Sequence, residues 1–236
     1  MISENKFLDK LYTVCQWVTK VYVSNLLWIL FSIPVFITIY ALAIQLNSNA
    51  DIFMATFWPC ITLIIVISPI TLFPSTAALI SIVRKWILKK EINSLFMDFV
   101  EGYKNNFKNS FKGGVVFAIV SFLLLTSIWL YGQLGTFMSI ILYYLCIILL
   151  VLTCISSMFY ISMIVHTESK WTIALKTSLI ISIIYPLETI IMTVVTTSAI
   201  MLCMKYTFLA PLIIGTFVTW YGFWRFERLY EKMLKI

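Results

Sequence analysis

The segment Ser68–Trp86 reads SPITLFPSTAALISIVRKW. Sixteen uncharged, mostly apolar residues come first, and Arg84 and Lys85 follow at once, which is the pattern of a chain that leaves a membrane for water. Residues 84–112 carry seven Lys and Arg side chains, and the chain becomes apolar again from Gly113. This basic segment, named the bridge below, predicts on which side of the membrane the flanking spans begin.

The composition excludes an ordinary soluble domain. Of the 236 residues, 61% are hydrophobic and only 11% are charged, with a mean hydropathy of +0.99, whereas soluble chains carry roughly 25% charged residues. The charge-free runs 21–50, 52–83 and 113–165 each exceed the ~20 residues that cross a bilayer. The sequence therefore predicts an all-α protein, a polytopic transmembrane helix bundle within a single integral membrane domain.

The hydrophobic pattern predicts about six spans. We place them at approximately 22–46, 53–83, 114–131, 137–165, 177–204 and 207–224. Proline removes an intrahelical hydrogen bond, and the predicted helix breaks are at Pro34, Pro69, Pro74 and Pro186. The second segment is too long for one straight helix, so it forms either one kinked span or a span with a re-entrant piece.

The basic residues are distributed unequally between the connections. The N-terminal arm, the bridge, the loop 166–176 and the C-terminal tail hold sixteen of the 17 Lys and Arg residues, and only Lys205 lies in an outer turn. This bias predicts that both termini are cytoplasmic. Because the bases cluster between spans, they suit topology and contacts with anionic lipid, and we expect no binding of nucleic acid.

The bridge is predicted to contain an amphipathic cytoplasmic helix at 91–112, because its apolar residues recur at steps of three and four. Such a face can lie on lipid, pack on the chain's own 166–176 and C-terminal segments, or dock a partner subunit, and its mixed charges favour a protein groove. The partner-docking candidates are Phe96, Phe99, Tyr103, Lys104, Phe107 and Lys108. Residues 5–20 form either a second surface helix or the first turn of the following span.

Few side chains could carry chemistry. Glu188 is the one ionisable residue well inside a predicted span, about 17 Å beyond Lys176 in a continuous helix. It is either a proton or cation site or substrate contact near the midplane, or a protonated acid that bonds to a neighbouring span. His166 is the sole histidine, and the five cysteines contain no C-x-x-C pair. We expect no metal site, no cofactor and no enzymatic activity.

Two blocks of sequence carry a family resemblance. NLLWILFSIP at 25–34 and FPSTAAL at 73–79, with VRKW at 83–86 and YKNNFKNS at 103–110, are similar to the signature of the YesL-like family of bacterial membrane proteins. The resemblance implies a bacterial cytoplasmic (inner) membrane and a biochemically uncharacterised role. It also implies an association with carbohydrate uptake, because members tend to be encoded beside such systems.

Three functional hypotheses follow. The leading one is a non-enzymatic accessory subunit of a solute, above all carbohydrate, uptake system. The alternatives are a stand-alone transporter or channel with Glu188 in its pathway, and a structural membrane scaffold. The expected partners are the lipid bilayer and either transporter subunits or further copies of this chain.

Overall fold

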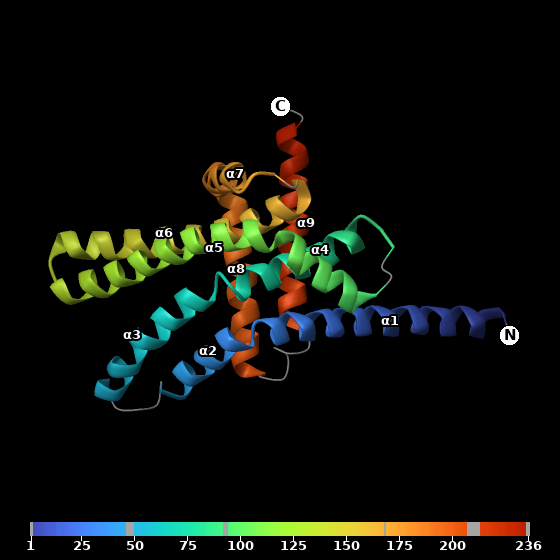
Figure 1. The fold of residues 1–236 in the computed structure, drawn as a ribbon, viewed down its shortest axis with the longest axis horizontal. Coiled ribbons are helices and arrows are strands. Elements are labelled where there is room, and N and C mark those ends of the chain that lie inside the picture. Colours follow the sequence, from blue (N-terminus) through green and yellow to red (C-terminus); the bar gives the residue numbers. More distant parts are fainter. Residues whose placement is uncertain (1, 46–49, 92–93, 168, 207–212, 235–236) are drawn as a thin grey trace.

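The computed structural model describes residues 2–45, 50–91, 94–167, 169–206 and 213–234. Among these residues it contains nine α-helices, which confirms the all-α class (Figure 1). Their bounds are α1 Ile2–Phe31, α2 Ile33–Gln45, α3 Ala50–Ile67, α4 Leu72–Ile87, α5 Leu95–Leu134, α6 Phe137–Thr167, α7 Trp171–Ile184, α8 Pro186–Lys205 and α9 Gly215–Leu234.

Helix α4 lies at the centre of the bundle and is the most completely buried element. Residues 74–80, Ile82 and Val83 are all buried. The helix contacts α1, α5, α6 and α9, and its small residues allow the close approach that helix packing in membranes uses. Ser75 Oγ lies 2.6 Å from Ser32 Oγ, and Trp28 Nε1 donates to Thr76 Oγ1 at 3.1 Å. The segment Ser68–Trp86, which shows the change from apolar to basic residues, thus contains nearly all of the most buried helix of the fold.

Helices α5 and α6 form a long antiparallel hairpin that extends to the left in Figure 1. Their connection is tight, and Gly135 adopts φ +60° at the end of α5, a conformation that favours glycine. Further along α5, Gly113 lies against the ring of Tyr160 on α6. Gly114 lies against Phe73 and the backbone of Pro69. The glycine pair is therefore where α5 passes closest to α6 and to the start of α4.

Four helices are long and apolar enough to cross a membrane: Leu11–Phe31, Leu95–Leu134, Phe137–Thr167 and Pro186–Cys203. A fifth is possible by length and composition if Ala55–Ile67 and Leu72–Ile87 count as one span, bent by 51°. The described part of the chain thus offers four or five spans, where the sequence predicted about six. The chain is a multi-pass membrane protein whose exposed apolar side chains contact lipid.

The predicted span boundaries differ from the helices in three places. The predicted surface helix 5–20 continues into the first span as α1, and α1 ends before Ser32, so 22–46 is divided between two helices. The predicted helix 91–112 and the predicted span 114–131 are one 40-residue helix, α5. The predicted span 177–204 breaks at Tyr185 into α7 and α8.

The last predicted span, 207–224, has no counterpart among the candidate spans. Residues 207–212 lie outside the described part of the chain. Helix α9 carries Arg225, Glu227, Arg228, Glu231 and Lys232 along its second half. These charges leave α9 too polar to be a candidate span by composition.

Each of the four predicted helix breaks lies in the first turn of a helix or between two helices. Pro34 is the second residue of α2, and Pro186 is the first residue of α8. Pro69 lies in the break between α3 and α4, and Pro74 lies in the first turn of α4. Proline is tolerated at such positions because the first backbone N–H groups of a helix have no intrahelical acceptor.

The ends of the helices are spread around the bundle. In Figure 1 the α5–α6 turn and the end of α2 lie on the left, the N-terminus lies on the right and the C-terminus lies at the top. The side that faces the cytoplasm stays a prediction, which cysteine labelling of Gln133 against Lys104 would test.

Candidate functional site: a polar cleft between α4, α5 and α6

A cleft of about 440 Å³ lies between the C-terminal half of α4, the N-terminal half of α5 and the end of α6. Helix α4 presents Ser81, Arg84 and Lys85 to it, at the i, i+3 and i+4 spacing of one helix face. Helix α6 contributes Ile164 and Val165. The α5 side consists of Asp98, Glu101, Gly102, Asn105, Asn106 and Asn109. The cleft is therefore the place where the basic end of the buried central helix faces a row of acids and amides.

A set of short contacts holds the two walls together. Lys85 Nζ lies 3.1 Å from Asp98 Oδ1, and Arg84 Nη1 donates to the carbonyl oxygen of Val165 at 3.0 Å. Asn106 Nδ2 donates to the Gly102 carbonyl oxygen at 2.9 Å and lies 3.4 Å from Ser81 Oγ. Salt bridges of this partly exposed kind stabilise little by themselves, so these contacts chiefly fix the geometry of the polar groups.

The absence of a side chain at Gly102 brings the walls close. A Cβ there would lie 3.0 Å from Ser81 Cβ and 3.3 Å from the Cα atom of Ala78. The close approach of Gly102 to α4 is a packing feature that the local sequence does not show.

Two polar atoms of the cleft have no hydrogen-bond partner among the described residues. They are Nε of Arg84, a donor, and Oδ2 of Asp98, an acceptor, and both atoms are buried. The side chain of Asp98 is only 10% exposed. Unsatisfied buried polar groups are costly, and a partner molecule that supplies the missing hydrogen bonds recovers that free energy. The walls of the cleft thus contain one donor and one acceptor that no described residue satisfies.

Arg84 also connects the cleft with α9. Burial raises the pKa of Glu227, the neighbouring Glu231 raises it further, and the positive charge of Arg84 lowers it. The net direction is upward, so burial and repulsion between acids outweigh the attraction to Arg84. Arg84 therefore lies at the junction of three helices, α4, α6 and α9.

The fold buries some of the docking candidates predicted on the bridge and leaves others exposed. Phe99 is fully buried with Ala78, Leu79 and Ile82, and its ring lies 5.2 Å from that of Phe31. Tyr103 and Phe107 are half-buried, and Tyr103 Oη donates to the Ile70 carbonyl oxygen at 3.1 Å. The groove that receives this face is formed by α1 and α4. The described residues of the segment 166–176 and of the C-terminal tail, which were one of the predicted alternatives, do not form it.

The other docking candidates remain accessible. Phe96 is 56% exposed and its neighbour Met97 is 72% exposed. Lys104 and Lys108 are also exposed and extend the same water-facing half of α5. Met97 was not among the candidates, because it lies off the apolar face that the helical spacing defined.

Glu188 occupies a different environment from the predicted one. Because α7 ends at Ile184 and α8 begins at Pro186, Glu188 lies in the first turn of α8 and not deep in a continuous helix. Its Oε1 accepts a hydrogen bond from Arg225 Nη1 at 3.4 Å, and its Oε2 lies 3.4 Å from Arg225 Nε. That Nε donates to Tyr221 Oη at 3.0 Å. The continuous helix assumed for this segment is wrong, and the ion pair joins the start of α8 to α9. The depth of Glu188 in the bilayer stays a prediction.

The Arg225 partner was not foreseen, because it lies 37 residues away from Glu188 in the chain. Among the described residues, no group of three or more His, Cys, Asp or Glu side chains could hold a metal ion. His166 lies among the rings of Phe223, Phe226 and Tyr230.

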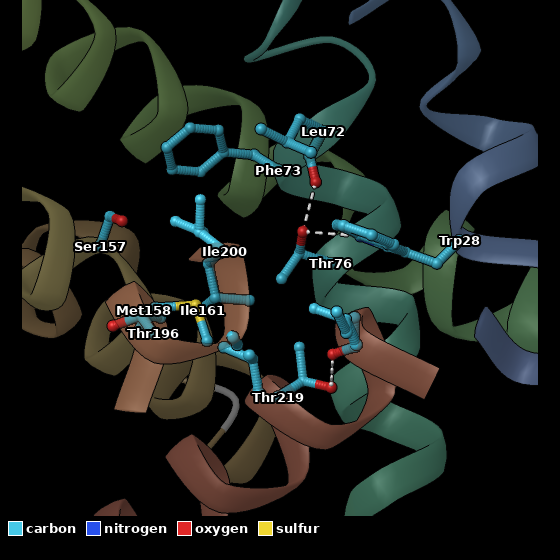
Figure 2. A pocket seen from close by; sticks show the side chains of 14 residues that line it. Trp28, Leu72, Phe73, Thr76, Ser157, Met158, Ile161, Thr196, Ile200 and Thr219 are labelled. Carbon is cyan, nitrogen blue, oxygen red and sulfur yellow. Dashed lines mark hydrogen bonds between the residues drawn. The ribbon is translucent and has the colours of Figure 1, made fainter. Parts of the chain in front are cut away.

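A second pocket, of about 270 Å³, lies further along α4 and α6 and is apolar (Figure 2). Its walls come from α1, α4, α6, α8 and α9. The hydroxyl of Thr76 donates to the Leu72 carbonyl oxygen at 2.7 Å, and that of Thr219 donates to the Gly215 carbonyl oxygen at 2.8 Å. The described residues that line this pocket thus include no charged side chain, in contrast to those that line the cleft.

These features define an all-helical, multi-pass membrane protein with a polar cleft at the basic end of its central helix. Residues 21–128 match the family model described as "Protein of unknown function, DUF624". The matched segment runs from α1 into α5 and contains every cleft residue except Ile164 and Val165. No curated protein and no solved structure matches the chain.

Proposed function

We propose that the protein is a non-enzymatic accessory subunit of a solute uptake system in a bacterial inner membrane, and that the solute is a carbohydrate. The observation that supports this proposal is the polar cleft, with its unpaired donor on Arg84 and unpaired acceptor on Asp98. The class of solute rests on the resemblance to the YesL-like proteins together with the chemistry of the cleft.

The cleft offers the groups that hydroxyl-rich solutes require. Each hydroxyl group both donates and accepts, an amide side chain does the same, and a carboxylate accepts while a guanidinium donates. The α5 wall of the cleft presents three amide side chains between Asp98 and the middle of the helix, namely Asn105, Asn106 and Asn109. Charges of both signs line the cleft, so a simple anion or a simple cation would meet repulsion from part of the wall.

The distribution of polar groups favours an accessory role over a conduit. A channel or stand-alone transporter requires polar groups along a path through the bilayer. The neighbouring pocket along α4 and α6 is apolar, and its Thr76 and Thr219 hydroxyls are already bonded to their own helices. Glu188 is held by Arg225 at the start of α8. The cleft therefore suits binding at one face of the membrane.

The exposed end of α5 supplies a surface for the partner subunit. Phe96 and Met97 present apolar surface to water beside the bases Lys104 and Lys108. A photo-crosslinking residue at Met97 should link to a component of an uptake system in cells. The matched control is Met138, which is 64% exposed at the opposite end of the hairpin. Equal linking from both positions, or none to an uptake component, would refute the docking proposal.

Solute binding is tested with the purified full-length protein in mild detergent. Glucose, galactose, maltose and lactose are titrated by calorimetry, and Asn105→Ala, which removes an exposed amide of the cleft, should weaken binding of the sugar that binds. Gln133→Ala removes an exposed amide at the far end of α5 and should leave binding unchanged. A protein that binds none of these sugars, or binds them equally after Asn105→Ala, contradicts the assignment.

A further inference from the structure

The apolar pocket of Figure 2 is lined in part by α6 and α8, two of the helices that are long and apolar enough to cross a membrane. Met158 lies nine residues before the end of α6 and Thr196 ten residues after the start of α8, so the pocket wall lies well inside both helices. The exposed apolar sides of such helices contact lipid chains.

The hydroxyl groups that line the pocket already donate their hydrogen bonds within the protein, so a water molecule would find few partners there. Thr76 and Thr219 donate to their own helices, Ser157 Oγ donates to the Cys154 carbonyl oxygen at 2.7 Å, and Thr196 donates to the Met192 carbonyl oxygen. A stable buried water requires two to four polar partners, and apolar cavities remain dry. The pocket is about 270 Å³, larger than the roughly 150 Å³ apolar cavity that accepts benzene. An apolar molecule is the occupant that fits.

The pocket is continuous with the surface that contacts lipid. Ala199 on its wall is 6% exposed, whereas the adjacent Ile200, also on the wall, is 58% exposed. Further exposed apolar residues of α8 include Ile190 and Val194, each 59% exposed. These exposed side chains contact lipid, so a lipid chain beside α8 reaches the pocket at Ile200 without crossing a polar barrier.

We propose that the pocket binds one acyl chain of a bilayer phospholipid, which enters beside Ile200 between α8 and α4. Because the bilayer is as apolar as the pocket wall, transfer from water contributes nothing. Binding is driven by the dispersion contacts that the lining residues lack when the space is unfilled. The chain thereby completes the packing between α8, α9 and the central helix. This site is independent of the polar cleft and of the proposed function.

Trp28 supplies the reporter, since its indole forms part of the pocket wall (Figure 2). The full-length protein is reconstituted in phosphatidylcholine with bromine atoms at the middle of one acyl chain and then extracted in mild detergent, which dilutes the surrounding lipid. The Trp28 contribution is the fluorescence difference between the wild type and Trp28→Phe. We expect bromine quenching of this contribution to survive extraction, and native mass spectrometry to show a retained phospholipid.

Ala199→Phe fills the pocket and should abolish both the persistent quenching and the retained lipid. Ala43→Phe is the matched control, because Ala43 is exposed on α2, and it should behave as the wild type. If Ala199→Phe does not fold, the smaller Ala199→Leu replaces it, with a partial loss expected. Persistent quenching that is equal in the filled variant, or no persistent quenching in the wild type, overturns the proposal. So does a filled variant that retains the lipid but loses self-association, because a second copy would then be the occupant.

Discussion

Gly113→Ala should destabilise the protein, because the new methyl group enters the ring of Tyr160. The added Cβ would lie 2.2 Å from Cε1 and Cζ of that ring and 2.4 Å from its Oη. Carbon atoms in contact prefer about 3.5 Å, so the ring or the helix must move by more than ~1 Å. Tyr160 is fully buried, and its Oη donates to the Asn109 carbonyl oxygen at 2.6 Å, so the ring cannot swing aside freely.

The expected change in the free energy of unfolding is the sum of two destabilising contributions and one stabilising contribution. Overpacking costs ~1–3 kcal/mol, and disturbing the hydroxyl contact costs about 1 kcal/mol more. Replacing a helical glycine by alanine returns up to ~1 kcal/mol. The net loss is about 2 kcal/mol, or roughly 4–8 °C in the unfolding temperature of a chain of this size.

The assay is thermal unfolding of the purified protein in detergent, followed by tryptophan fluorescence. Gly132→Ala is the control on the same helix, because its Cβ would lie 3.7 Å from Tyr143 Cε2, an ordinary contact. It should leave the unfolding temperature unchanged or slightly raised. Tyr160→Val opens the space, so Gly113→Ala should cost little in that background. An unfolding temperature of Gly113→Ala at or above the wild type refutes the reasoning, as does an equal loss in Gly132→Ala.

Four further predictions use the same unfolding assay. Phe99→Ala should cost about 3–5 kcal/mol, because it empties a fully buried site. Phe96→Ala should change the stability by less than about 0.5 kcal/mol, because the side chain is 56% exposed. A double-mutant cycle of Glu188→Gln and Arg225→Gln should give a coupling of only ~0.2–1 kcal/mol, since the pair is partly exposed, and a larger value would contradict its surface character. Glu227→Gln should raise the unfolding temperature at neutral pH and lose that advantage below about pH 4, because the raised pKa of Glu227 means that its charged form destabilises the fold; a variant less stable than the wild type at neutral pH would contradict this sign.

The class of fold followed from composition, because a mean hydropathy of +0.99 admits few alternatives to a membrane bundle. The bend in the segment 53–83 also has a local cause that the sequence displays, since Pro69 follows directly on the end of α3. The continuity of α5 has none. Gly113 and Gly114 resemble a break between a surface helix and a span, and only the contacts with Tyr160 and Phe73 explain why they lie inside one straight helix.

The candidate site was harder to predict, because its residues act in pairs from different helices. Arg84 and the amides of 105–109 were visible as parts of a resemblance, but nothing in the spacing indicated that they face one cleft. The contact of Asp98 with Lys85 and its burial depend on how α5 packs on α4. The partner of Glu188 was hidden for a similar reason, because Arg225 comes from another helix and the helix assumed to continue through Glu188 ends at Ile184.

The unbroken length of α5 has a mechanical consequence. Forty residues at 1.5 Å each make a rod of about 60 Å, with Phe96 and Met97 at one tip and the turn at Gly135 near the other. The glycine pair 113–114, pressed against Tyr160 and Pro69, is the point at which this rod is gripped by its neighbours. Before this pair α5 packs on α1 and α4, and beyond it α5 packs on α6. One continuous helix therefore belongs both to the packing around α4 and to the hairpin, and a displacement of its exposed tip acts first on the contacts with α1 and α4.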